Sequence, residues 1–196
     1  MEGRKLFGPL EGFASLYKSF RDMHFLKNAK KKNLINEKFQ ERIMLSITQV
    51  NGCPLCSYYH TQAALESGID DEEVKALLEG ELSDAPKEER EALLFAQHYA
   101  DSRSHYSKKA YEQILREYGR EKTQGVLAAI EMITVGNTYG MPFGSFLSHF
   151  SRDKSKKDAR SSILYELLMI VTVVPFACVA FLAASVRNIV HFPSHV

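Results

Sequence analysis

Tryptophan is absent from the 196 residues, and cysteine occurs only three times. Three cysteines are too few for a small secreted protein that is stabilised by several disulfides, so we expect the thiols of this chain to be reduced. A pair of cysteines close in sequence then needs a redox or metal explanation. Basic and acidic side chains nearly cancel, 25 against 24, which leaves no overall field that would steer the chain toward nucleic acid. We therefore expect no nucleic-acid partner.

An apolar leader is also missing from the beginning of the sequence. Residues 1–9 carry charged side chains but no continuous apolar stretch of the kind that a secretory signal contains. We therefore expect a cytoplasmic protein. Because 45% of the residues are apolar, the chain can bury a core, and general disorder is excluded. The length predicts one domain, which we place at residues 1–150, followed by an appendage.

No segment shows the alternation of apolar and polar residues that is typical of a β-strand, whereas apolar residues recur at helical spacing between helix caps. The sequence therefore predicts an all-α protein. The expected helices cover residues 13–26, 34–50, 53–68, 70–80, 84–99 and 107–119. A further apolar helix should begin near Glu121 and loosen around Gly136, Gly140 and Pro142, because glycine and proline disfavour a helix interior.

The most informative segment contains two cysteines and a histidine at helical spacing, Cys53-Pro54-Leu55-Cys56 followed by His60. On a helix these three side chains fall within about 60° of one another. Pro54 favours the first helical position, which makes Cys53 the N-cap and puts Cys56 in the first turn, where the helix end stabilises a thiolate. Such a pair can open and close a disulfide without moving the backbone, and the histidine can take the proton of the attacking thiol.

Glu41 lies in the preceding expected helix, 34–50, whose apolar residues cover nearly its whole circumference. A buried carboxylate is costly without a partner. After the short turn at 51–52 the two helices should run antiparallel, which makes His60 a reasonable partner for Glu41. A carboxylate that orients a histidine serving a thiol is a proton relay. A plain buried salt bridge is the alternative role for Glu41.

Together these residues resemble a known family. Glu41, eleven intervening residues, and then Cys53-x-x-Cys56-x-x-x-His60 are similar to the active-site signature of alkylhydroperoxidase D and its relatives in the carboxymuconolactone decarboxylase family, over residues 35–150. The resemblance implies a helical bundle with antiparallel active-site helices that assembles as trimers or hexamers. It also implies that Cys56 attacks a peroxide, that Cys53 resolves it as a disulfide, and that Glu41 and His60 relay protons.

One departure from the family pattern limits what the resemblance implies, and a difference among the relatives narrows the activity. Alkylhydroperoxidase D has a histidine immediately before the second cysteine, where this chain has Leu55. The proton relay is therefore shorter, and the sequence leaves open both the reductant of the cysteine pair and the rate of peroxide reduction. Relatives that decarboxylate the lactone lack the cysteine pair, so its presence here argues against that activity.

We therefore expect a thiol-dependent peroxidase or disulfide oxidoreductase that binds no cofactor and uses an external dithiol, such as a lipoyl-carrying reductant protein. Cys53 at the cap should lie closer to solvent, where that dithiol can reach it. A redox sensor or a non-catalytic assembly protein on the same scaffold is the alternative. A zinc site is disfavoured, because three ligands on one short stripe cannot enclose a tetrahedral ion.

The appendage consists of a basic stretch, 151–162, that looks like an exposed linker, and an apolar helix over 163–190. Its uncharged run Leu167–Val186 is long enough to span a bilayer. This helix is either a membrane anchor, with the basic stretch 152–160 on the inner face of the membrane, or a helix buried in the oligomer and bent at Pro175. Membrane association is favoured, because the catalytic core of the relatives is complete by residue 150.

Overall fold

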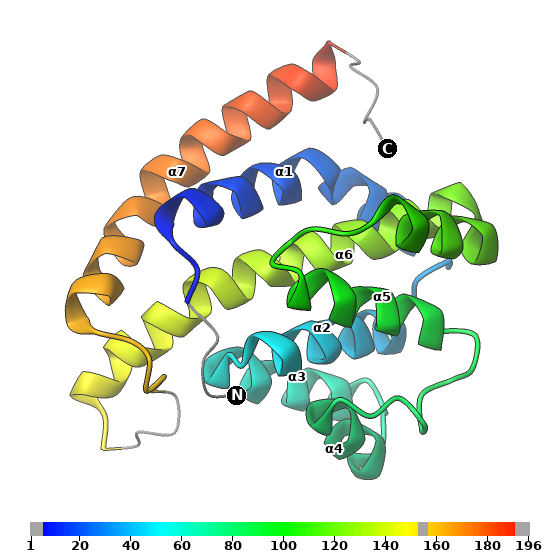
Figure 1. The fold of residues 1–196 in the computed structure, drawn as a ribbon, viewed down its shortest axis with the longest axis horizontal. Helices are drawn as coiled ribbons and strands as arrows, with labels where there is room; N and C mark the ends of the chain where they lie inside the picture. The colour runs from blue at the N-terminus through cyan, green and yellow to red at the C-terminus, as the bar shows by residue number, and fades with distance from the viewer. Residues whose placement is uncertain (1–5, 153–156, 191–196) are drawn as a thin grey trace.

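The computed structural model describes residues 6–152 and 157–190, and within them it contains only helices and their connections (Figure 1). The all-α prediction is confirmed. The helices are α1 (Pro9–Lys31), α2 (Glu37–Asn51), α3 (Pro54–Glu66), α4 (Asp71–Glu79), α5 (Arg90–Asp101), α6 (Lys108–Phe150) and α7 (Ile163–Ile189).

Helix α2 forms the centre of the core, with α3, α4, α5 and α6 packed around it. Every residue from 41 to 48 is buried, including Ile43, Leu45 and Ile47, as its all-round apolar pattern predicted. Asn36 caps the first turn by accepting a hydrogen bond from the Phe39 N–H. The helix ends at Gly52, whose left-handed backbone (φ 67°) turns the chain back into α3. The helix that carries Glu41 is thus held on all sides.

Helix α6 crosses the whole molecule and differs from the prediction in its second half. Gly119 interrupts it with a non-helical backbone (φ 70°, ψ 170°), which is where the sequence predicted one helix to end and the next to begin. The expected loosening around Gly136, Gly140 and Pro142 is wrong, because the helix continues to Phe150. Contacts with α1, α2, α3 and α7 stabilise this stretch and outweigh the weak helix preference of glycine and proline.

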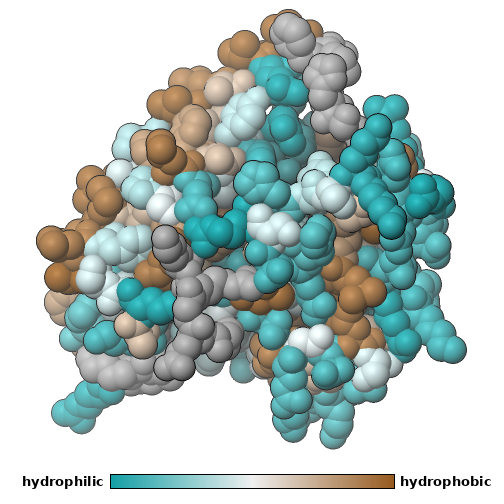
Figure 2. All heavy atoms as spheres, in the orientation of Figure 1, coloured by the Kyte–Doolittle hydropathy of each residue, from teal (hydrophilic) through white to brown (hydrophobic). Residues whose placement is uncertain are grey.

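Helix α7 lies along α1 at the edge of the molecule (Figure 1). The rings of Phe13 and Phe176 and those of Phe20 and Phe181 meet edge to face, each pair with centroids 5.6 Å apart. Ala180 and Ala184 are buried, so the small side chains face inward and allow the close packing. The opposite side of α7 is exposed and apolar, as the brown atoms along that edge in Figure 2 show.

The exposed apolar side of α7, which we call the outer face, consists of large apolar side chains that are each more than 40% exposed. Among the described residues, α7 is the one helix long and apolar enough to cross a membrane, by length and composition. The outer face consists of Leu164, Leu167, Leu168, Val171, Val174, Val179, Phe181, Leu182, Val186 and Ile189.

Candidate active site around the cysteine pair

Cys53 and Cys56 form a disulfide at the start of α3, with their Cα atoms 5.3 Å apart. Cys53 is the N-cap of the helix and Pro54 is its first residue, as predicted. The backbone N–H of Cys56 donates to Cys53 Sγ over 3.3 Å, which is the bond that a serine or asparagine oxygen makes at this position. The same N–H and the positive helix end would stabilise a thiolate on Cys53 once the disulfide opens.

Glu41 and His60 are joined as the sequence predicted. Glu41 Oε2 lies 2.8 Å from His60 Nδ1, and the carboxylate is buried while a quarter of the histidine side chain is exposed. Glu41 comes from α2 and His60 from α3, so the contact also shows that the two helices run back along each other. His60 follows Cys56 by four residues, which places both on one face of α3 one turn apart. The carboxylate therefore orients a histidine on the same helix face as the second cysteine.

Gly140 of α6 makes room for the disulfide. A Cβ atom added to this residue would lie 2.8 Å from Cys56 Sγ and 3.3 Å from Cys53 Sγ, so any other residue would collide with the sulfurs. One turn earlier, the carbonyl oxygen of Gly136 lies 3.4 Å from Cys56 Sγ. The sequence marked both glycines only as helix breakers. A glycine inside a long helix can mark a place where another segment comes close to the helix backbone. This was the signal in the sequence that could have predicted the contact between α6 and the cysteine pair.

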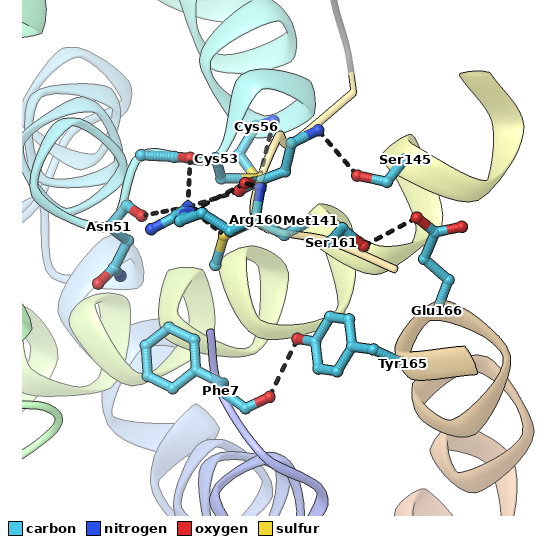
Figure 3. Close-up of polar contacts among 12 residues, drawn as sticks. Phe7, Asn51, Cys53, Cys56, Met141, Ser145, Arg160, Ser161, Tyr165 and Glu166 are labelled. Carbon is cyan, nitrogen blue, oxygen red and sulfur yellow. Dashed lines mark hydrogen bonds and ion pairs between the residues drawn. A yellow bond between two sulfur atoms is a disulfide. The ribbon is translucent and has the colours of Figure 1, made fainter. Parts of the chain in front are cut away.

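A set of apolar side chains covers the disulfide. Phe7, Leu55 and Met141 pack against the two cysteines, with Leu6 beside them. The Tyr165 hydroxyl donates to the carbonyl oxygen of Phe7 over 3.0 Å, which ties the N-terminal segment to the first turn of α7 (Figure 3). We call Phe7, Met141 and Arg160, which is described next, the cover of the disulfide.

Arg160 lies in the basic stretch that the sequence predicted to be an exposed linker. Its guanidinium donates to the carbonyl oxygens of Gly52 (3.3 Å) and Asn51 (3.5 Å) and lies 3.4 Å from Met141 Sδ (Figure 3). Within residues 157–162 the expected exposure holds for Lys157, Ala159 and Ser162, whereas Asp158 is buried and Arg160 packs against the turn before α3; residues 153–156 lie outside the described part of the chain. No sequence pattern distinguishes Arg160 from its basic neighbours.

Asp158 fixes the position of Arg160. Its carboxylate accepts bonds from the backbone N–H and side chain of Arg160, and its own N–H donates to Ser145 Oγ over 2.9 Å. Burial by itself raises the pKa of the Asp158 carboxyl, but these bonds from Arg160 outweigh it and lower the pKa below its ordinary value. Asp158 is therefore ionised at neutral pH and holds the arginine against α6.

The cover also corrects the expectation that Cys53 lies closer to solvent. Cys53 is 0% exposed and Cys56 is 7% exposed, so the second cysteine is the more accessible of the two. The N-cap position alone suggested exposure, but Phe7 and Met141 close that side.

No group of three or more His, Cys, Asp or Glu side chains that could hold a metal ion occurs within residues 6–152 and 157–190. His149 lies 2.9 Å from the buried Glu166 and joins the end of α6 to the start of α7. This pair links two helices at the edge of the cover. It contains too few ligands for a metal.

Comparisons with known proteins agree with the signature. No curated protein and no solved structure matches the chain. The sequence model of the carboxymuconolactone decarboxylase family matches residues 15–98, which run from α1 to α5 and include Glu41, Cys53, Cys56 and His60. The helical scaffold and the cysteine pair fit the alkylhydroperoxidase D branch of that family. Over residues 15–98 the chain is therefore similar to the carboxymuconolactone decarboxylase family.

Proposed function

We propose that this protein is a thiol-dependent peroxidase that reduces hydrogen peroxide or alkyl hydroperoxides through Cys56 and Cys53. The observation that carries the proposal is the combination of a cysteine pair at a helix start with a histidine one turn later that a buried carboxylate holds at 2.8 Å. A structural disulfide would need neither the histidine nor the carboxylate. This combination supports proton transfer during thiol chemistry.

The reaction begins with both cysteines as thiols. The proton of Cys56 moves to His60, and the thiolate attacks an oxygen of the hydroperoxide, so that a sulfur–oxygen bond forms and the oxygen–oxygen bond breaks. The departing alkoxide takes the proton from His60 and leaves as an alcohol, while Cys56 becomes a sulfenic acid. Cys53 then attacks the Cys56 sulfur, and its proton and the hydroxyl leave as water. The product is the Cys53–Cys56 disulfide.

An external dithiol of the lipoyl type would return the disulfide to the reduced state. Because Cys56 is the more exposed of the two residues, we place the attack of the dithiol there. Cys53 is then the leaving thiolate, and the Cys56 N–H, 3.3 Å from its sulfur, stabilises the charge. The second thiol of the reductant completes the exchange and releases Cys56. The two electrons that reduced the peroxide thus come from the dithiol.

A redox sensor is the second candidate function, and the cover is the observation that favours it. Phe7, Met141 and Arg160 limit the access of a reductant to the disulfide, which suits a switch that is oxidised once and persists. A sensor and an enzyme differ in the number of peroxide molecules that one chain consumes.

The assignment of the two cysteines is tested with single serine variants. Cys56→Ser should abolish peroxide turnover, whereas Cys53→Ser should allow one oxidation that stops at a sulfenic acid on Cys56. A sulfenic acid probe followed by mass spectrometry of the peptides identifies the oxidised residue. Sulfenic acid on Cys53 in the Cys56→Ser variant, with turnover retained, would reverse the roles.

We further propose that the outer face of α7 contacts the inner face of the membrane. Because α7 lies along α1, as the pairs Phe13–Phe176 and Phe20–Phe181 show, the geometry favours a helix lying in the membrane surface over one that projects away from the fold. Cell fractionation tests this, since recovery of all the protein in the soluble fraction without detergent would contradict it. The trimer or hexamer expected from the family stays a prediction, to be measured by light scattering.

A further inference from the structure

A cavity of about 300 Å³ lies between α6 and α7, and none of its lining residues is charged. Tyr139, Gly140 and Phe143 form the α6 side, and Ile170 and Val173 form the α7 side. The Tyr139 hydroxyl is buried near Gly12 of α1, where an added Cβ would lie 2.6 Å from it, so the tyrosine presents mainly its ring to the cavity. The walls are therefore apolar nearly throughout.

The cavity adjoins the cysteine pair through one residue. Gly140 lines the cavity, and the Cβ that it lacks would lie 2.8 Å from Cys56 Sγ. No side chain stands at this position between the cavity and the sulfurs. The cavity and the cysteine pair thus share Gly140 as a neighbour.

The chemistry of the walls indicates the class of ligand. A peptide or a polar metabolite would lose hydrogen bonds to water on entering and would find few partners on these walls, which is costly. An aliphatic chain has no such cost. An apolar cavity of about 150 Å³ is enough for a benzene ring, so about 300 Å³ accepts a considerably longer hydrocarbon segment.

The surroundings of the cavity indicate where such a chain comes from. Phe143 of the cavity wall and Leu147, one turn later in α6, are both exposed, and on α7 the outer-face residues Val171 and Val174 directly follow the lining residues Ile170 and Val173. The cavity therefore has exposed apolar side chains of both helices next to it. A membrane in contact with this side would present acyl chains next to the cavity.

We propose that the cavity between α6 and α7 binds the aliphatic chain of a lipid-derived hydroperoxide. This inference rests on the proposed peroxidase function and adds its substrate class. The chain is held between the two helices, and the hydroperoxide group is delivered to the side of α6 on which Cys56 lies. The protein then prefers long-chain hydroperoxides to hydrogen peroxide.

Binding is tested without turnover by titrating the full chain with 1-decanol, an alcohol of the kind that the reaction releases, in a calorimeter. Val173→Trp fills the cavity, and Val174→Trp adds the same side chain at the neighbouring position, which is 67% exposed. We expect one decanol site in the wild type and in Val174→Trp, and at least tenfold weaker binding in Val173→Trp. Ile170→Phe adds less volume and should weaken binding in the same direction if Val173→Trp does not fold.

Turnover supplies the second measurement. Val173→Trp should lower the ratio of kcat/KM for decyl hydroperoxide to kcat/KM for hydrogen peroxide at least tenfold, and Val174→Trp should leave this ratio at its wild-type value. Absence of decanol binding in the wild type, or equal binding in all the variants, would overturn the inference even if peroxide is consumed. Decanol binding that Val173→Trp weakens, in a chain that turns over no peroxide, would instead refute the peroxidase function and support the binding site.

Discussion

Gly140 gives the sharpest test of the site geometry, because a single methyl group there would collide with both sulfurs. In Gly140→Ala the new Cβ would lie 2.8 Å from Cys56 Sγ and 3.3 Å from Cys53 Sγ, against an ordinary contact of 3.4–4 Å. At Gly136, one turn away in the same helix, an added Cβ meets only Ile133 Cδ1 at 3.5 Å. Gly136→Ala is therefore a matched control.

The expected magnitudes follow from two opposing effects. Alanine in place of an interior helical glycine favours the helix by about 0.8–1.0 kcal/mol in both variants. Overpacking adds a cost of about 1–3 kcal/mol in Gly140→Ala alone. Gly136→Ala should therefore be as stable as the wild type or more stable, and Gly140→Ala should be less stable than Gly136→Ala by about 1–3 kcal/mol. For a chain of this length the difference corresponds to roughly 2–12 °C in Tm.

The assay is thermal or urea unfolding of the oxidised protein, followed by circular dichroism. Both glycine variants are also made in a Cys53→Ala, Cys56→Ala background, as a double-mutant cycle. Because this background lacks the two sulfurs, it shows whether they cause the loss of stability in Gly140→Ala. There Gly140→Ala should behave like Gly136→Ala. Equal stability of the two variants in the oxidised protein, or a penalty that persists without the sulfurs, would refute the close approach of α6 to the disulfide.

Three further predictions follow from the site and the core. Glu41→Gln should slow peroxide turnover by about 10²–10⁴-fold, because His60 loses the carboxylate that orients it, and an unchanged rate would make Glu41 a structural carboxylate. Arg160→Ala should let dithiothreitol reduce the disulfide about tenfold faster, because loss of a charged hydrogen bond worth about 1.5 kcal/mol loosens the cover. Lys157→Ala, which changes an exposed lysine of the same segment, should leave the reduction rate unchanged. Burial, together with the charge of Asp22, raises the pKa of Glu131 to about 8. The folded state therefore keeps a proton that the unfolded state loses above about pH 4.5, and stability should fall as the pH rises from 5 to 8. Glu131→Gln should reduce this fall, which urea unfolding at the two pH values measures; an equal fall in both proteins would contradict the assignment.

The parts of the site that the sequence predicted depend on local signals. Gly52, Cys53 at the N-cap, Pro54 and the one-turn spacing to His60 all lie within a few residues of one another, and each acts through helix-end chemistry. The contact between Glu41 and His60 required only that two helices joined by a tight turn run antiparallel. Short stretches of the chain determine these features, so the sequence of those stretches is enough to predict them.

The parts that the sequence did not predict depend on contacts between distant segments. Arg160 reaches the carbonyl of Gly52 across 108 residues, and nothing in its own neighbourhood indicates that the chain folds back there. The continuity of α6 through Gly140 results from its contacts with α1, α2, α3 and α7, which outweigh glycine's own weak helix preference. In α7 the apolar residues surround the helix, so only the structure shows that Ala180 and Ala184 face inward.

The central claim is that the cysteine pair acts catalytically, and the most direct test is to count the peroxide molecules consumed per chain in the presence of excess dihydrolipoamide. We predict that the wild type consumes many equivalents, at a steady rate proportional to enzyme concentration, and that Cys56→Ser consumes none above the background reaction. Consumption that stops at one equivalent per chain, with the Cys53–Cys56 disulfide formed and not reduced by the dithiol, would contradict the peroxidase and identify a sensor.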